Sequence, residues 1–152
     1  DHQIKLSVDI KAKPEVIWRA LTDVKVMQQW SPDFRMEESV VELKVGGGYS
    51  YGWYPKKVPV DKYMDGPSKI LKLEGGKLLV VNWHGSTMSE VSWKLEEKGN
   101  GITRVVFKHT KMPAYPTQEI WSYRLGWTCD LYNLKKFAEV GEVCTDWQKQ
   151  EG

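Results

Sequence analysis

Aromatic side chains are the most unusual chemical feature of this 152-residue sequence, which carries eight tryptophans and seven tyrosines. An indole combines a large apolar surface with one N–H donor, and a phenol adds a hydroxyl. Such side chains can hold an apolar or aromatic molecule and orient it through a few hydrogen bonds. Because a small core needs few tryptophans, we expect some of them to line space other than tightly packed core.

Eight side chains are the candidates for lining a ligand cavity, although the hydroxyls of Tyr49 and Tyr51 could instead reach solvent. They are Tyr49, Tyr51, Trp53, Trp83, His109, Tyr123, Trp127 and Leu131. His109 is in phase with Val105 and Phe107 along a strand, so it should point inward as a polar anchor. A core histidine bonded to helix or loop backbone is the commoner alternative. Ordinary core packing is the alternative for the tryptophans, and it is the one we favour for Trp93.

No set of residues with catalytic or metal-binding spacing is evident. Gly46–Gly48 precedes a strand rather than a helix, so it does not predict a phosphate-binding loop. Glu37 and Glu38 lie on opposite faces of a strand and cannot converge. The three histidines are scattered without ligand spacing. The sequence therefore predicts no catalytic residues, no metal and no cofactor, and it favours binding over catalysis, although a positioned His, Tyr or Asp could still serve an enzyme.

Charge and hydropathy narrow the possible partners. The net charge is 22 − 20 = +2, so no large basic field predicts binding to nucleic acid or to an acidic membrane. No run of eighteen apolar residues predicts a membrane span, and the alternating N-terminus does not resemble a signal peptide. Cys129 and Cys144 are predicted to be reduced thiols, with Cys129 partly shielded beside the buried face of a helix. These features predict a cytoplasmic protein.

The first half of the chain predicts a strand, two short helices and then further strands. Apolar residues alternate over 4–10, as in a half-buried strand. Pro14 begins a helix, and Thr22–Asp23 can end it and cap a second helix over Val24–Trp30. A strand over Met36–Val45 and a second one over 49–53 are expected on either side of the three glycines. Residues 54–67, with three prolines, are expected to be irregular.

The second half predicts four strands and one long helix. Gly75–Gly76 separates two strands as a hairpin turn, and two more alternating segments follow around residues 91–96 and 103–109. The period then changes to three or four residues, which predicts a helix of about six turns. Its apolar stripe comprises Ile120, Tyr123, Trp127, Leu131, Leu134 and Ala138. Gly141 is expected to end this helix, and Gly126 is expected to let another element approach closely.

The predicted order is β-α-α-β-β-β-β-β-β-α in one domain, with a core over about residues 4–140 and a polar tail. Consecutive strands joined by hairpins form an antiparallel sheet. The long helix must bury its stripe against the concave face of that sheet. Strong curvature combined with a long helix tends to leave an internal cavity between them.

Seven segments, in order along the chain, resemble the START-like (SRPBCC) superfamily, and within it the branch named after the activator of heat-shock-protein-90 ATPase. They are residues 13–23, 29–30, 45–49, 79–83 and 103–109, Gly126–Trp127, and Leu131 with Leu134. The resemblance implies an α+β helix-grip fold, of the START-like or Bet v-like kind, in which a curved antiparallel sheet wraps around a long C-terminal helix. Where the family usually carries an ordinary hairpin, residues 54–67 differ, so the rim of the cavity is not expected to be typical.

Three functions are compatible with this resemblance, because one fold hosts many activities. The first is a binding protein that holds a small apolar or aromatic ligand between sheet and helix. The second is a co-chaperone that interacts with the heat-shock-protein-90 ATPase. The third is an enzyme of the polyketide cyclase type. The aromatic content and the lack of a catalytic set favour the first.

Overall fold

The computed structural model describes residues 2–31, 41–49, 68–83 and 89–141 of the chain. Its elements follow the predicted order, except that no strand over Met36–Val45 is among those of the described residues. They are β1 (His2–Ile10), α1 (Pro14–Thr22), α2 (Val24–Trp30), β2 (Gly48–Tyr49), β3 (Ser68–Glu74), β4 (Leu78–Asn82), β5 (Glu90–Gly99), β6 (Ile102–Met112) and α3 (Thr117–Val140).

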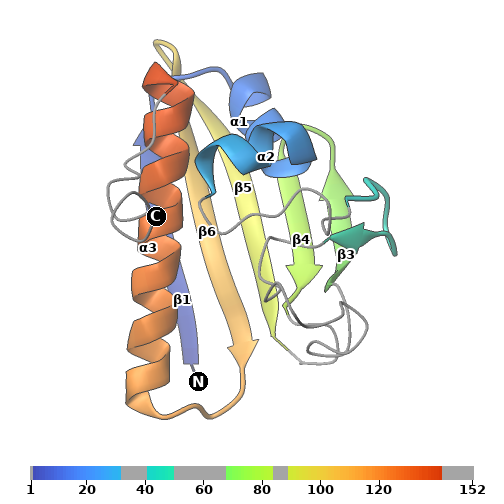
Figure 1. Cartoon of the computed structure of the whole chain (residues 1–152), viewed down its shortest axis with the longest axis vertical. Coiled ribbons are helices and arrows are strands. Elements are labelled where there is room, and N and C mark those ends of the chain that lie inside the picture. Colours follow the sequence, from blue (N-terminus) through green and yellow to red (C-terminus); the bar gives the residue numbers. More distant parts are fainter. Residues whose placement is uncertain (1, 32–40, 50–67, 84–88, 142–152) are drawn as a thin grey trace, which may run out of the picture.

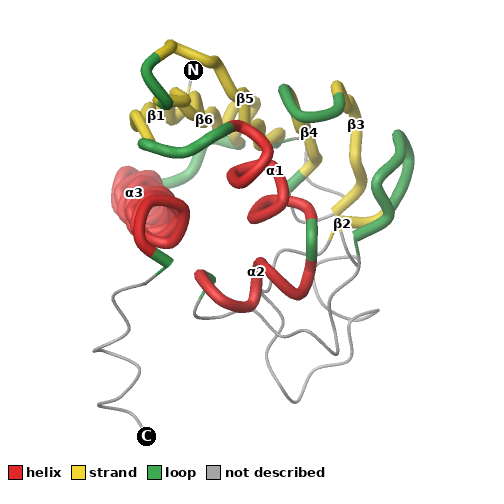
Figure 2. The backbone as a smooth tube through the Cα atoms, turned by 90° about the horizontal axis from the view of Figure 1, so that it is seen from above, coloured by secondary structure: helices red, strands yellow, loops and turns green. Residues whose placement is uncertain are grey.

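The strands form one six-stranded sheet in the order β1-β6-β5-β4-β3-β2, and every neighbouring pair is antiparallel. Alternation along each strand decides which face is buried. On β5, for example, Val91, Trp93 and Leu95 are buried, whereas the residues between them are exposed or half-buried. The strands curve around the helices, which lie together on the concave side (Figure 2). The predicted α+β helix-grip fold is confirmed.

The long helix α3 lies lengthwise beside β1 and β6 (Figure 1). Its predicted stripe is confirmed: Trp127, Leu131 and Leu134 are buried in the core, and Ile120, Tyr123 and Ala138 pack against that core. Gly141 takes the left-handed conformation at φ 75° and donates its N–H to the carbonyl of Phe137. This geometry is the usual glycine stop of a helix, as the sequence predicted.

The opposite face of α3 also carries apolar side chains. Trp121, Leu125 and Tyr132 are 66%, 67% and 51% exposed. They follow one another at intervals of four and seven residues, which places them on one side of the helix. Apolar residues therefore occupy two faces of α3, of which the longer, predicted stripe is the buried one.

The two short helices are joined and capped by Asp23. The side chain of Asp23 accepts a hydrogen bond from the backbone N–H of Lys25 at 2.9 Å, which satisfies a donor at the start of α2. Trp30, at the end of α2, donates its indole N–H to the carbonyl of Ala20 at 2.7 Å. These bonds fold α2 back onto α1 and confirm the predicted boundary at Thr22–Asp23.

The strand expected over Met36–Val45 does not reach Val45. In the described part of this stretch, Val41 forms an isolated bridge with Tyr49, and residues 44–46 form a turn. Gly47 explains the difference, because a Cβ at this position would lie 2.1 Å from the carbonyl oxygen of Glu42. The chain folds back on itself there and continues directly into β2. The expected strand residues 36–40 and the segment 54–67 lie outside the described residues.

Within the described ranges, no helix has the length and apolar character needed to cross a membrane.

Candidate functional site

Trp127 is the centre of a cluster of aromatic rings between α3 and the sheet. Its ring centroid lies 4.5 Å from that of Phe107, 4.9 Å from Trp83 and 6.2 Å from Trp93. The contacts with the two tryptophans are edge-to-face, the arrangement that aromatic quadrupoles favour. The indole is only 3% exposed. Strands β5 and β6, together with Trp83 just beyond β4, therefore hold the centre of α3 through contacts between aromatic rings.

His109 supplies the polar group of this cluster. It is buried at 1% exposure, and its Nδ1 atom accepts a hydrogen bond from the indole N–H of Trp127 at 3.2 Å. Because an indole nitrogen can only donate, Nδ1 must be unprotonated. The neutral imidazole therefore carries its proton on Nε2, which makes that atom a donor. The sequence predicted an inward His109, and the structure shows a bond from the side chain of Trp127 to it.

Two tyrosines extend the cluster from His109 toward the surface. The ring of Tyr123 stands edge-on to His109 at 5.3 Å, and the ring of Tyr115 lies 5.8 Å from Tyr123. Both tyrosines are half-buried. Tyr115 belongs to the short connection between β6 and α3, so the half-buried end of the cluster lies where α3 begins. A row of rings thus leads from the core to the protein surface.

Tyr49 occupies the other end of the cluster and is fully buried. Its hydroxyl donates to the carbonyl of Leu21 at 2.7 Å, and its ring lies 6.0 Å from that of Trp93. Burial, with a smaller contribution from the negative charge of Asp130, raises the pKa of this hydroxyl above its ordinary value. The hydrogen bond ties β2 to the end of α1, which indicates a structural role for the phenol.

Leu131 is buried one turn beyond Trp127. It also borders a small hollow of about 200 Å³ between β1 and α3, together with Leu6 and Val8. Its position is therefore separate from the half-buried end of the cluster.

The structure brings four of the predicted site residues into contact: Trp83, His109, Tyr123 and Trp127. Tyr49 joins them through Trp93, and Leu131 belongs to the same hydrophobic core. Tyr51 and Trp53 lie outside the described residues.

Sequence reasoning missed Phe107 and Tyr115 as members of the cluster. Phe107 could have been found, because it shares a strand face with His109 two residues away. Tyr115 lies between Pro113 and Pro116, where no strand or helix period applies. Its contact with Tyr123 arises only from the tertiary fold.

The arrangement offers an aromatic surface with one imidazole, which suits binding of planar or apolar molecules. In the described ranges, no three His, Cys, Asp or Glu side chains converge as metal ligands would.

Comparison with solved structures shows the same fold in several proteins. A protein from Enterococcus faecalis, EF2215, is 22% identical and superposes with a TM-score of 0.74 over 93% of this chain and 74% of its own. The Aha1 dimer from Colwellia psychrerythraea is 23% identical, with a TM-score of 0.69 over 93% of this chain and 99% of its own. PFC0360w, an HSP90 activator from Plasmodium falciparum, is 18% identical, with a TM-score of 0.63 over 84% of this chain and 89% of its own.

A sequence search among curated proteins found no match. The family model described as "Activator of Hsp90 ATPase homolog 1-like protein" matches residues 11–139. This range includes every element from α1 to the last turn of α3. The chain therefore belongs to the activator of Hsp90 ATPase homolog 1-like family.

Proposed function

We propose that this protein binds a small aromatic or apolar molecule between the sheet and α3. The ligand would lie at the half-buried end of the aromatic cluster, against Tyr115, Tyr123 and His109. Internal space at this position is part of the proposal. The supporting observation is the continuous row of rings, which runs from the buried Trp127 through His109 to Tyr123 and Tyr115.

Two further features support this position. Tyr115 lies in a connection rather than in a strand or helix, so it can adjust to a ligand at a smaller energetic cost. The rings beneath it are held by Trp127, whose indole is fixed by the bond to His109. A fixed aromatic floor below an adjustable Tyr115 would reduce the entropy lost on binding.

The first test is native mass spectrometry of freshly purified protein. A small molecule that co-purifies at one per chain is the expected result. The second test is a titration with the fluorescent probe 1-anilinonaphthalene-8-sulfonate. Tyr123→Ala should weaken probe binding, roughly tenfold if one ring contact worth about 1.4 kcal/mol is lost.

Trp121→Ala provides the matched control, because Trp121 is an aromatic residue on the same helix but is 66% exposed on its outer face. This variant should bind the probe as tightly as the unmodified protein. Equal weakening in both variants, or weakening only in Trp121→Ala, would contradict a site at the Tyr123 end of the cluster.

A second candidate function is interaction with the heat-shock-protein-90 ATPase, which the family description supports. Retention of the ATPase on immobilised protein, followed by an ATP turnover assay, would test it.

We also propose that the protein is cytoplasmic, a location that is consistent with either function. The free, exposed thiol of Cys129 supports that location, since such thiols persist in reducing compartments.

A further inference from the structure

The outer face of the sheet, turned away from the helices, carries a second site of different character. A hollow of about 440 Å³ lies over β1, β6, β5 and β4. Four of its lining side chains are cationic: Lys5, Lys94, Arg104 and Lys108. One lining side chain, Glu96, is anionic.

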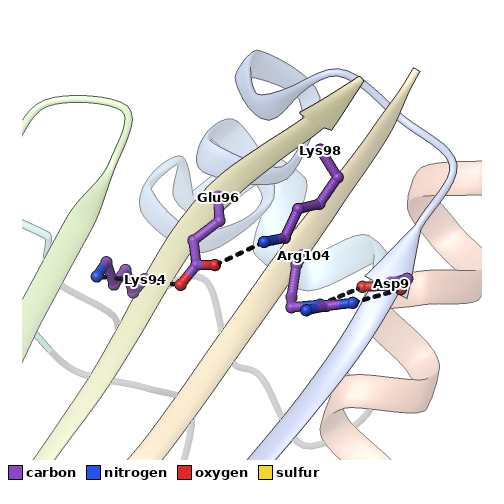
Figure 3. Close-up of polar contacts among 5 residues, drawn as sticks. All are labelled: Asp9, Lys94, Glu96, Lys98 and Arg104. Atoms are coloured by element: carbon purple, nitrogen blue, oxygen red, sulfur yellow. Dashed lines mark hydrogen bonds and ion pairs between the residues drawn. The ribbon is translucent and has the colours of Figure 1, made fainter. Parts of the chain in front are cut away.

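Ion pairs account for only part of this positive charge. Arg104 is held by Asp9 through two hydrogen bonds of 2.8 and 3.2 Å. Glu96 is shared between Lys98 at 3.3 Å and Lys94 at 3.9 Å. Figure 3 shows the pair of Asp9 and Arg104 beside the group formed by Glu96 and its two lysines, toward one end of the strands. Lys94 is therefore only weakly compensated.

The remaining cations, Lys5 and Lys108, are directly opposite each other in the β1–β6 register. Both side chains are exposed, and neither forms an ion pair with an acidic residue in the described ranges. Like charges at directly opposite positions destabilise an antiparallel pair. The fold gains nothing from this arrangement, whereas an anion placed between the two ammonium groups would gain from both.

The hollow also offers apolar and hydroxyl groups. Val106 and Leu78 are half-buried and line it, and each lies beside Lys94 in the cross-strand register. Ser92, next to Lys108 across the strands, and Ser7 on β1 add hydroxyl groups. Lys94 and Lys108 are diagonal neighbours on adjacent strands, so their side chains begin about 7–8 Å apart. The charges are thus spread around an apolar centre rather than gathered at one point.

This distribution indicates the kind of anion that fits. A compact phosphate is usually held by converging backbone N–H groups. Here the backbone of the floor is engaged in strand pairing, so recognition depends on side chains that are several ångströms apart. Separated carboxylates on either side of an apolar side chain match this pattern better. An extended peptide presents such groups at regular intervals.

We propose that the outer sheet face docks an acidic peptide segment of a partner protein. One carboxylate lies between Lys5 and Lys108, an apolar side chain rests on Val106 and Leu78, and a second carboxylate approaches Lys94. This site lies on the opposite face of the sheet from the aromatic cluster and does not depend on it.

The test uses fluorescence anisotropy with the full chain and a fluorescein-labelled peptide of sequence Gly-Asp-Glu-Leu-Asp-Glu-Gly. At about 20 mM salt, binding should be saturable, and it should weaken severalfold at about 150 mM salt because the charges are exposed. Lys5→Gln and Lys108→Gln should each weaken binding up to about fivefold, which corresponds to about 1 kcal/mol for an exposed charge contact. The double variant should lose at least tenfold.

Lys25→Gln is the matched control, since it removes one exposed lysine from α2 on the other side of the sheet. It should bind the peptide normally. Thermal unfolding supplies an independent readout: Lys5→Gln and Lys108→Gln should unfold at the same or a higher temperature, because they relieve repulsion. A lower unfolding temperature in these variants would contradict the argument that the fold gains nothing from the pair.

Competing anions separate the possible occupants. Inorganic tripolyphosphate, vesicles containing phosphatidylserine and a single-stranded DNA oligonucleotide should each compete more weakly than the unlabelled peptide. Equal or stronger competition by any of them, absence of peptide binding, or equal loss in Lys25→Gln would overturn the proposal.

Discussion

Trp127 on α3 and His109 on β6 are joined by a hydrogen bond of 3.2 Å between two buried side chains. The two residues are 18 positions apart in the sequence, and the bond fixes both rings. The same rings lie beneath the proposed ligand position. We therefore expect substitutions at the buried end of the cluster to lower stability, and substitutions at its half-buried end to weaken ligand binding.

Replacing Trp127 tests the buried end of the cluster. Trp127→Ala removes a ring that contacts Trp83, Trp93 and Phe107, and should cost about 3–5 kcal/mol of unfolding free energy. Trp127→Phe keeps much of the packing but leaves His109 without its indole donor, and should cost about 1–3 kcal/mol. Urea denaturation followed by circular dichroism measures both values. A loss from Trp127→Ala below about 1 kcal/mol would instead indicate a ring that borders open space.

Tyr49 predicts a specific response to alkaline pH. Because its pKa is raised in the folded protein, the phenol stays protonated in the native state at pH values at which the unfolded state has lost the proton. The raised pKa stabilises the native state below about pH 10, and this contribution is lost as pH rises above that value. Tyr49→Phe also removes the bond to Leu21 and should cost about 1–2 kcal/mol at neutral pH. The difference between the two proteins should shrink above pH 10, by at most about 1.4 kcal/mol per pH unit. Denaturation at several pH values measures it, and a constant difference up to pH 11 (about one unit above the ordinary tyrosine value) would contradict the prediction.

Gly126 predicts a stabilising substitution. The sequence suggested that this glycine allows close approach of another element, but a Cβ built there meets no heavy atom of the described residues within 4 Å. That expectation is therefore wrong, and Gly126→Ala should stabilise α3 by about 0.5–1 kcal/mol through helix propensity. Gly141→Ala is the contrasting control, because its φ of 75° makes an alanine there destabilising. Thermal unfolding of both variants measures these effects. A lower unfolding temperature for Gly126→Ala would show that the space beside residue 126 is occupied.

Cys129 predicts the thiol chemistry of the native protein. The sequence placed it in a shielded position beside the buried stripe, but the structure shows it exposed. Cys129 lies two positions from both Trp127 and Leu131, and two positions turn a side chain about 200° around the helix, to the side opposite the buried stripe. In a Cys144→Ser variant, a thiol reagent should therefore titrate one thiol per chain without denaturant. A thiol that reacts only after unfolding would mean that Cys129 is covered.

Local patterns predicted most of the fold because local chemistry determines those features. Alternation from Ile4 to Ile10 identifies β1, the Asp23 side chain caps α2, and Gly75–Gly76 makes the β3–β4 turn. Each depends on neighbours within a few residues. The packed stripe of α3 was also predicted, although the helix carries a second apolar face at Trp121 and Leu125.

The features that sequence reasoning missed depend on contacts between distant segments. The expected strand does not reach Val45 because Gly47 approaches the carbonyl of Glu42. Secondary-structure propensities do not include such a contact. Likewise, Tyr115 joins the aromatic cluster because a connection rich in proline delivers it to α3. The partner of His109 required knowledge of how α3 is rotated against β6.

The sheet order has a consequence for how the chain folds. β1 occupies an edge and pairs only with β6, so Ile10 meets Thr103 after the intervening strands have been made. The β3–β4 and β5–β6 hairpins close short loops, whereas β1 must close a loop of about ninety residues, at a larger entropic cost. We expect β1 and α3 to join last, which φ-values near zero in both elements would show. On the ribosome, β1 therefore emerges long before β6 and cannot form this pairing until about ninety further residues have been synthesised.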